Sequence, residues 1–369
     1  MSLRKVNAIH QMLPSFLSRD AIGNQAFRMR EILRKWGIDS QIYAQDRDPQ
    51  WADSGIDYRR YRGDQNNLLI LHHALGSDVS DFAAQLPDQL VFYYHNITPS
   101  EYLRGYNPSM ADMADRGRKQ LELYKNRPFA LAGSEYNRME LLSAGFNDVG
   151  TMPYFIYVDE LLEAAESDAG RRIADRYRDG WVNILFVGRI VPNKKQDDLI
   201  RAFGYYHKLV NPKSRLIMVG SEVCAPGYRW ELETTAELLG LGRHVHMPGS
   251  VELQELGGYY RAASVFLCMS EHEGFCVPLL EAMAFDIPVL AFKATGVPDA
   301  LGDSGVLLTR KNCDVVGEML GLLVSDQRLR TQIVAGQRRR LESYTHIDIA
   351  AQFRQCIQHI LAEPEEKTG

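Results

Sequence analysis

Short, uninterrupted apolar runs recur along this chain, and stretches with helical periodicity separate them. Strands that are apolar at consecutive positions are typical of parallel sheets covered by helices on both faces. The first series of runs comprises residues 6–10, 41–44, 68–73, 90–95 and 129–134, and the second comprises residues 182–188, 215–220, 244–247, 264–270 and 288–292. The pattern predicts an α/β fold with two Rossmann-like, doubly wound domains.

The length of 369 residues also suits two domains better than one. The segment 159–181 is charged, favours helix and has few core-forming residues, so we place the seam there. We expect an N-terminal domain over residues 1–160 and a C-terminal domain over residues 161–346. The last amphipathic stretch, at about residues 347–362, is expected to be a packing helix that completes the N-terminal domain.

Composition excludes several classes of protein. The net charge of −5 argues against a general nucleic-acid-binding surface. Five cysteines without CxxC spacing fit reduced thiols in the cytoplasm better than a disulfide framework. The first residues lack the apolar core of a signal peptide, and no apolar run is long enough to span a bilayer. We therefore expect a cytoplasmic protein. If it works at a membrane, it lies on the membrane surface.

Open α/β sheets bind ligands at the carboxyl ends of their strands, and the segment EHEGFCVPLLE at residues 271–281 follows such a strand. Pro278 suits the first turn of a helix, so the preceding loop presents free amides to an anion such as a diphosphate. Gly274 permits a close backbone approach. Glu273 and Glu281 would then reach different parts of one ligand. The alternative, that both acids favour the helix N-terminus and face solvent, stays open on spacing alone.

Three further strand ends carry polar residues. Arg189 and Lys194 supply two cations suited to a phosphate. Gly23 and Asn24 open an amphipathic helix and present a second helix N-terminus. His95 ends a strand, where an imidazole can position a hydroxyl or exchange a proton. Each has an alternative interpretation. The two cations would lie in a solvated loop, the Gly-Asn pair would be an ordinary turn, and the histidine would be structural.

Two short patterns resemble metal sites but lack partners. Asp46 and Asp48 lie in a charged loop without a third ligand in the sequence nearby. His244 and His246 alternate on one strand without cysteines or acids at metal-binding spacing. We therefore expect neither a metal nor any other cofactor.

Taken in order, the segments of the second half resemble the retaining glycosyltransferases of family four. The segments that carry the resemblance are FVGRIVPNKK, RLIMVGS, HVHMPGSVELQELGGYYRAASVFLCMS, EGFCVPLLEAMAFDIPVLAF and ATGVPDALGDSGVLL. The N-terminal half matches more loosely through IGN, HNITP and LAGSEYNRMELLSAGF, and YHNITP resembles bacterial members that build surface polysaccharides. The resemblance implies the GT-B fold, in which two Rossmann-like doubly wound domains face a cleft.

The resemblance also implies roles for the matching residues. Arg189 and Lys194 would hold the donor diphosphate, Glu273 would contact the donor sugar, and His95 would face that sugar. Glu281 would hold the ribose of the nucleotide. The other implied donor-site residues are Gly188, Met247, Pro248, Ser250, Gly274, Phe275, Cys276 and Val277, with Gly23 and Asn24 near the phosphates or the acceptor.

The chain departs from the family pattern at several glycine positions. Cys276 and Asp286 stand where many members have glycine, and Asn24 stands where a second glycine is frequent. Asp299 replaces a common glutamate. The departure at Cys276 bears most on the identity of the donor, because its Cβ would approach the sugar.

The function that the resemblance implies is metal-independent, retaining transfer of a hexose in polysaccharide or lipopolysaccharide biosynthesis. The donor would be a nucleotide sugar, with GDP-mannose favoured over UDP-sugars, and the acceptor a glycan or lipid-linked glycan. A lipid-linked acceptor would place the enzyme peripherally on the cytoplasmic face of the inner membrane, and residues 116–127 form a candidate basic surface. A small soluble acceptor and a non-catalytic nucleotide-sugar-binding scaffold are the alternatives.

Overall fold

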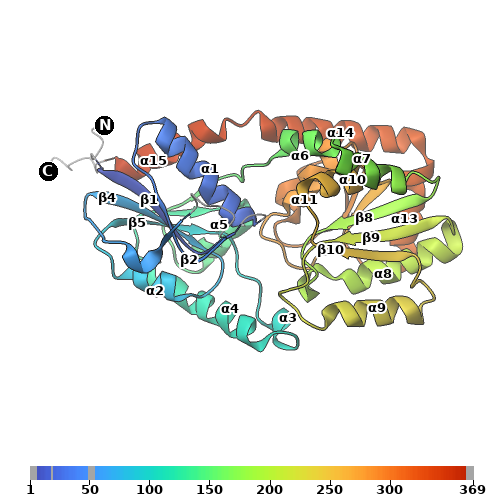
Figure 1. Ribbon diagram of the computed structural model, residues 1–369, viewed down its shortest axis with the longest axis horizontal. Helices are drawn as coiled ribbons and strands as arrows, with labels where there is room; N and C mark the ends of the chain where they lie inside the picture. The colour runs from blue at the N-terminus through green and yellow to red at the C-terminus, as the bar shows by residue number, and fades with distance from the viewer. Residues whose placement is uncertain (1–5, 18–19, 49–54, 363–369) are drawn as a thin grey trace. The chain divides into compact units, whose positions relative to one another are not determined.

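The structure is a computed structural model, and it describes residues 6–17, 20–48 and 55–362 (Figure 1). The chain divides into two compact units. The N-terminal unit comprises residues 1–97, 112–155 and 347–369, and the C-terminal unit comprises residues 98–111 and 156–346. Each unit contains its own parallel sheet. The two doubly wound α/β units predicted from the apolar runs are therefore present.

The N-terminal unit contains a seven-stranded sheet in the order β3-β2-β1-β4-β5-β6-β7, with neighbouring strands parallel. Its strands are β1 (Ala8–Phe16), β2 (Ile42–Arg47), β3 (Ile56–Asp57), β4 (Asn67–His73), β5 (Gln89–Tyr94), β6 (Ala130–Ala132) and β7 (Val149–Thr151). Its helices are α1 (Ala21–Lys35), η1 (Tyr58–Arg60), α2 (Asp78–Ala84), most of α4 (Pro108–Gln120), η2 (Leu121–Leu123), α5 (Glu135–Ser143) and α15 (Ile349–Leu361).

Helices cover both faces of this sheet, which is why its central strands are apolar at consecutive positions (Figure 1). Leu69 and Leu71 of β4 belong to one core cluster, whereas Leu68 and Ile70 belong to the cluster on the opposite face. Phe353 of α15 is buried in that second cluster. The C-terminal helix thus packs on the N-terminal sheet.

The C-terminal unit contains a six-stranded parallel sheet in the order β10-β9-β8-β11-β12-β13. Its strands are β8 (Val182–Val187), β9 (Ser214–Val219), β10 (Val245–Gly249), β11 (Val265–Cys268), β12 (Val289–Phe292) and β13 (Val306–Leu308). Its helices are α3 (Glu101–Arg104), α6 (Val158–Ala165), α7 (Asp168–Arg176), η3 (Pro192–Lys194), α8 (Gln196–Tyr205), η4 (Tyr206–Val210), α9 (Tyr228–Leu238), α10 (Leu253–Ala262), α11 (Val277–Ala284), α12 (Val297–Leu301), α13 (Cys313–Ser325) and α14 (Gln327–Thr345).

The strand order of each sheet reverses once. In the C-terminal sheet the chain proceeds from β8 outward to β10 and then returns to β11 on the other side of β8. In the N-terminal sheet the same reversal falls between β1 and β4. Loops that leave two such neighbouring strands diverge, and ligands of open α/β sheets bind in the crevice between them. A ligand site is therefore expected between the loops that follow β8 and β11.

The boundary between the units differs from the predicted one. The predicted seam at 159–181 contains α6 and α7, and both pack on α10 of the C-terminal unit. Gly257 of α10 makes this contact tight, since a Cβ there would lie 2.8 Å from Ala165. The boundary falls after residue 155 instead of 160, and residues 98–111 group with the C-terminal unit. The sequences of α6 and α7 are rich in charged residues, and for that reason these two packed helices resemble a linker in the sequence.

Candidate active site

Two loops at the switch point of the C-terminal sheet carry the predicted donor-site residues. The loop after β8 contains Lys194, and the loop after β11 contains Glu273. Hydrogen bonds in both directions join the loops. Asn193 Nδ2 donates to the carbonyl of His272 at 3.0 Å, and the amide of Glu271 donates to the carbonyl of Asn193 at 2.9 Å. The two segments therefore form one connected surface although they lie far apart in the sequence.

Lys194 Nζ and Glu273 Oε2 form an ion pair at this switch point, and their side chains are only 13% and 8% exposed. A shielded pair of this kind is screened less by salt than a surface pair. The backbone of Glu273 is held as well, because its amide donates to Thr295 Oγ1 at 2.7 Å and its carbonyl accepts from the amide of Gly296 at 3.0 Å. The carboxylate and the ammonium are thus fixed before any ligand binds.

Gly296 allows the loop of Glu273 to pack against the turn before α12. A Cβ at Gly296 would overlap the carbonyl of Gly274. Only glycine fits this close approach without displacing the loop. The Gly-Val-Pro-Asp segment therefore acts as the support of the loop that carries Glu273.

Cys276 and Asp286, which stand where many family members have glycine, both have a left-handed backbone conformation. Cys276 has φ 78° and ψ 66° and caps α11, and Asp286 has φ 55°. The left-handed region favours glycine and costs other residues roughly 1–2 kcal/mol. Asp286 forms an ion pair with Arg338, while the Cys276 side chain is 9% exposed beside Glu273. The structure thus gives the reason why glycine is suited to both positions.

Helix α11 places Glu281 one turn beyond its start, next to Tyr260 of α10. The Tyr260 hydroxyl donates to Glu281 Oε2 at 2.6 Å, and Tyr260 is fully buried. Burial raises the pKa of Glu281, while burial and the nearby carboxylate raise the pKa of Tyr260 well above its ordinary value. The hydroxyl therefore stays protonated as a donor and fixes one of the two carboxylate oxygens.

Arg189 is exposed at the end of β8. Within the described residues no carboxylate pairs with its guanidinium, which lies 3.9 Å from Cys224 Sγ. Its backbone carbonyl accepts from Gln196 Nε2 at 2.8 Å, so the main chain is anchored while the side chain faces outward. An outward guanidinium on an anchored backbone is suited to a phosphate.

Three residues that support this site were not predicted. Asn193 and Thr295 hold the loops, and Tyr260 orients Glu281. Each acts through a contact between segments distant in sequence, so no local spacing marked it. Glu271, the first acid of the segment at residues 271–281, forms a further ion pair with Lys311 at 2.9 Å.

The family model of glycosyl transferases group 1 matches residues 177–340, the segment that contains Arg189, Lys194, Glu273 and Glu281. This segment of the chain thus resembles the glycosyltransferases of that family. The match covers most of the C-terminal unit. The resemblance inferred from the ordered motifs is thereby confirmed.

Curated glycosyltransferases are similar to parts of the chain. A GDP-mannose-dependent alpha-(1-6)-phosphatidylinositol monomannoside mannosyltransferase of Mycolicibacterium smegmatis is 30% identical over 49% of this chain and 49% of its own length. A D-inositol 3-phosphate glycosyltransferase of Thermobifida fusca is 34% identical over 41% of this chain and 36% of its length. The O-antigen chain mannosyltransferase B of Escherichia coli is 27% identical over 39% of this chain and 37% of its own length. The chain thus spans about half, or less, of the length of these relatives.

Solved glycosyltransferases share the fold at low identity. The sucrose-phosphate synthase of Thermosynechococcus elongatus matches with a TM-score of 0.72 at 16% identity, over 96% of this chain and 99% of that one. The fold is thus GT-B, as the resemblance implied.

The remaining donor-site candidates lie at the end of another strand of the C-terminal sheet. Met247, Pro248 and Ser250 are at the end of β10, at the same carboxyl edge as the loops of Lys194 and Glu273. Pro248 and Ser250 are exposed. The Met247 carbonyl accepts from Arg229 at 3.2 Å. Their proposed place beside the base stays a prediction.

The donor-loop residues that follow Glu273, up to the first residue of α11, differ in how far they are buried. Phe275 is 6% exposed, and its ring lies against Tyr344 with a centroid distance of 5.7 Å. Gly274 and Val277 are partly exposed. Phe275 therefore anchors the loop through its side chain, and the amides of this segment remain the groups predicted to approach the donor.

In the N-terminal unit, the geometry of His95 differs from the expected one. Its Nε2 contacts His72 Nδ1 at 2.9 Å and its Nδ1 contacts the Tyr154 hydroxyl at 3.2 Å. Burial, with the neighbouring histidines, lowers the pKa of His95 well below its ordinary value. The ring is 6% exposed and both nitrogens have partners inside the unit. Both ring nitrogens of His95 thus have partners inside the unit, and its role beside the donor sugar stays a prediction.

The start of α1 also differs from the expectation. The helix begins at Ala21, and the side chain of the N-cap residue Asp20 accepts from the Gly23 amide at 3.1 Å. Gly23 and Asn24 lie in its first turn, and a Cβ at Gly23 would lie 2.7 Å from the carbonyl of Leu17. The Gly23 amide is therefore already bonded to a carboxylate, and the place of Gly23 near the phosphates or the acceptor stays a prediction.

The candidate basic surface at residues 116–127 is largely neutralised. Arg116 forms ion pairs with Asp78 and Asp81, and Arg118 pairs with Glu140. Among the helices that the structure describes, none combines the length and the apolar character needed to cross a membrane. The expected membrane contact therefore stays a proposal without support from this segment.

Proposed function

We propose that this protein is a retaining hexosyltransferase that moves a sugar, with mannose as the leading candidate, from a nucleotide-sugar donor to a glycan or lipid-linked glycan. The observation that carries the proposal is the Lys194–Glu273 ion pair at the β8–β11 switch point, inside the segment that matches the glycosyltransferase family. Ligands of open α/β sheets bind at that position. A shielded cation held there by a carboxylate suits an anionic, sugar-bearing ligand.

The chemistry of transfer makes use of both cations. Cleavage of the anomeric C–O bond leaves negative charge on the diphosphate and positive charge on the sugar. Arg189 and Lys194 would stabilise the diphosphate, aided by the amides before α11, and such fixed groups act without reorganisation during the reaction. Glu273 would hold Lys194 in place and contact the donor sugar. In this proposal the two side-chain cations take the part that a metal ion plays elsewhere, so transfer needs no metal.

Retention of the anomeric configuration is part of the proposal. The loops after β8 and β11 place Glu273 in the ion pair with Lys194, where it is committed to a cation and poorly suited to attack the sugar. We favour attack by the acceptor hydroxyl on the same face as the leaving phosphate, which itself takes the proton.

Glu281 and Tyr260 suggest how the nucleotide is held. A half-buried carboxylate with one oxygen fixed by a tyrosine hydroxyl is a strong acceptor for a hydroxyl pair such as that of a ribose. The base would lie toward Met247, Pro248 and Ser250. GDP is the leading nucleotide, because a similar mannosyltransferase is named as GDP-mannose-dependent.

The acceptor is proposed from two relatives. The relative of Mycolicibacterium smegmatis is named for a phosphatidylinositol mannoside, and that of Escherichia coli for the O-antigen chain. Both names fit a surface or lipid-linked glycan as acceptor. We accordingly propose that this protein acts in polysaccharide or lipopolysaccharide biosynthesis at the cytoplasmic face of the inner membrane. A small soluble acceptor is the second candidate, favoured by the relative named for D-inositol 3-phosphate.

Nucleotide binding tests the proposed donor site. We expect calorimetric titration to show GDP binding more tightly than UDP or ADP. Glu281→Ala should weaken GDP binding by about 10–100-fold, because hydrogen bonds to a charged group contribute about 1.5–3 kcal/mol, and Tyr260→Phe should cause a smaller loss. Glu342→Ala, which removes an exposed acid from α14, is the control and should bind as wild type. Absence of binding by all three nucleotides, or equal affinities for wild type and Glu281→Ala, would reject this site.

A further inference from the structure

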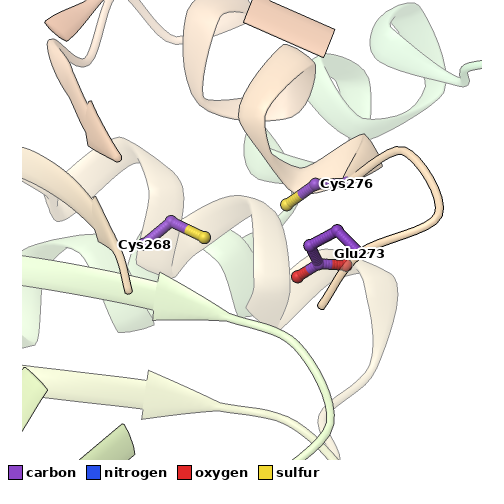
Figure 2. Close-up of side chains that lie close together, drawn as sticks. All are labelled: Cys268, Glu273 and Cys276. Atoms are coloured by element: carbon purple, nitrogen blue, oxygen red, sulfur yellow. The ribbon is translucent and has the colours of Figure 1, made fainter. Parts of the chain in front are cut away.

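The thiols of Cys268 and Cys276 lie close to the carboxylate of Glu273 (Figure 2). The same carboxylate forms the ion pair with Lys194. The Sγ atoms of Cys268 and Cys276 and a carboxylate oxygen of Glu273 all lie within 4.8 Å of one another. The three residues are 0%, 9% and 7% exposed, respectively. Over residues 6–17, 20–48 and 55–362, no other group of three histidine, cysteine or acidic side chains meets this criterion.

The cluster depends on three separate features of the backbone. Cys268 is the last residue of β11, Glu273 lies in the following loop, and Cys276 is the N-cap residue of α11. The Cys276 backbone is left-handed, a conformation that glycine adopts without strain. The chain therefore places a thiol beside Cys268 and Glu273 at a position where a side chain is costly.

We propose that Cys268, Glu273 and Cys276 bind one thiophilic divalent metal ion, such as Zn²⁺, and that the bound ion inhibits the enzyme. Two cysteines and one acid supply three of the four ligands of a tetrahedral zinc site, and water would complete it. Zn–S and Zn–O distances of about 2.3 and 2.1 Å place tetrahedral ligand atoms roughly 3.5–3.8 Å apart. The ligand atoms lie within 4.8 Å of one another, so each pair needs to approach by at most about 1.0–1.3 Å.

Binding of the ion would change the charges around Glu273. The two thiols would each release a proton to solvent, since thiolates are the ligands of zinc. The Glu273 carboxylate would exchange the ammonium of Lys194 for the metal as its cation partner. Metal and Lys194 would thus compete for one carboxylate, and the occupied site would lack the ion pair that positions Lys194. The inhibitory part of this inference rests on the proposed function, whereas metal binding does not.

Titration with Co²⁺, a coloured substitute for Zn²⁺, tests the site directly on the reduced protein under nitrogen. We expect one equivalent to bind with intense visible bands of a tetrahedral thiolate complex, and Zn²⁺ to bleach them. Cys268→Ala should weaken Co²⁺ binding by more than about 100-fold, the upper range for loss of an outer-shell partner. Cys356→Ala removes a partly buried cysteine of α15 and should bind as wild type.

The competition gives a second readout. Lys194→Met should bind Co²⁺ several-fold more tightly than wild type, because the rival cation is gone, whereas a merely structural role of Lys194 would weaken binding. Zn²⁺ should slow transfer by wild type but not by Cys268→Ala, when the rate of each protein is compared with its own rate in the presence of a chelator.

Circular dichroism verifies that each variant is folded. Wild type without the bands, bands that persist in folded Cys268→Ala, or weaker binding by Lys194→Met would overturn the inference, even if no transfer activity were found.

Discussion

Replacing Lys194 by alanine is expected to lower kcat by about 10²–10³-fold, equivalent to about 3–4 kcal/mol of barrier. The ammonium is held by Glu273 at the β8–β11 switch point, so it is oriented for the leaving diphosphate before the reaction begins. The variant also leaves Glu273 shielded from solvent without this partner, which places negative charge where the diphosphate must bind. Steady-state rates at saturating donor measure the effect.

The neighbouring lysine provides a matched control. Lys195 lies next in the chain, but its ammonium pairs with Asp197 at 3.2 Å instead of Glu273. Lys195→Ala should retain kcat within a few-fold of wild type. If Lys194→Ala turned over at a near-normal rate, or if both variants lost activity equally, Lys194 would not have the role assigned to it.

Gly220→Ala is expected to destabilise the C-terminal unit by about 3 kcal/mol, at the upper end for overpacking. A Cβ at Gly220 would overlap the carbonyl oxygen of Gly188, which is backbone and has no flexible end that can move aside. The displaced segment carries Arg189, so transfer should fall together with stability. Denaturant unfolding measures the free energy, and turnover at a temperature where the variant is folded measures activity.

Gly227→Ala separates overlap from backbone strain. Gly227 has φ +91°, and a Cβ there meets no atom within 4 Å. Its substitution should cost only the left-handed strain of about 1–2 kcal/mol and leave transfer largely intact. Equal losses for both variants would show that the approach of Gly220 to Gly188 does not control the loop.

Much of the fold followed from the sequence because buried parallel strands are continuous apolar runs. Residues 68–73 and 182–188 were predicted as strands and correspond closely to β4 and β8. The short strands β3, β7 and β13 were not predicted. Each has only two or three residues and stands at the edge of its sheet, so no long apolar run marks it.

The site was predictable only where local spacing carries the information. The helix that places Glu281 was predicted from Pro278, and α11 includes both residues. The partners Asn193, Thr295 and Tyr260 depend on contacts between distant segments, which spacing does not encode. The start of α1 is a different case, because aspartate is a preferred N-cap residue and Asp20 is a local signal for a helix that begins at Ala21.

A transfer assay tests the central claim most directly. Purified protein would be incubated with EDTA, with GDP-mannose or a UDP-hexose, and with lipid-linked glycan or inositol phosphate acceptors, and the product anomer read by NMR. The account predicts acceptor-dependent transfer of the sugar, fastest from GDP-mannose to the glycan acceptor, with the anomeric configuration of the donor kept. Failure to transfer from every nucleotide sugar, an absolute requirement for a divalent metal, or an inverted product would contradict it.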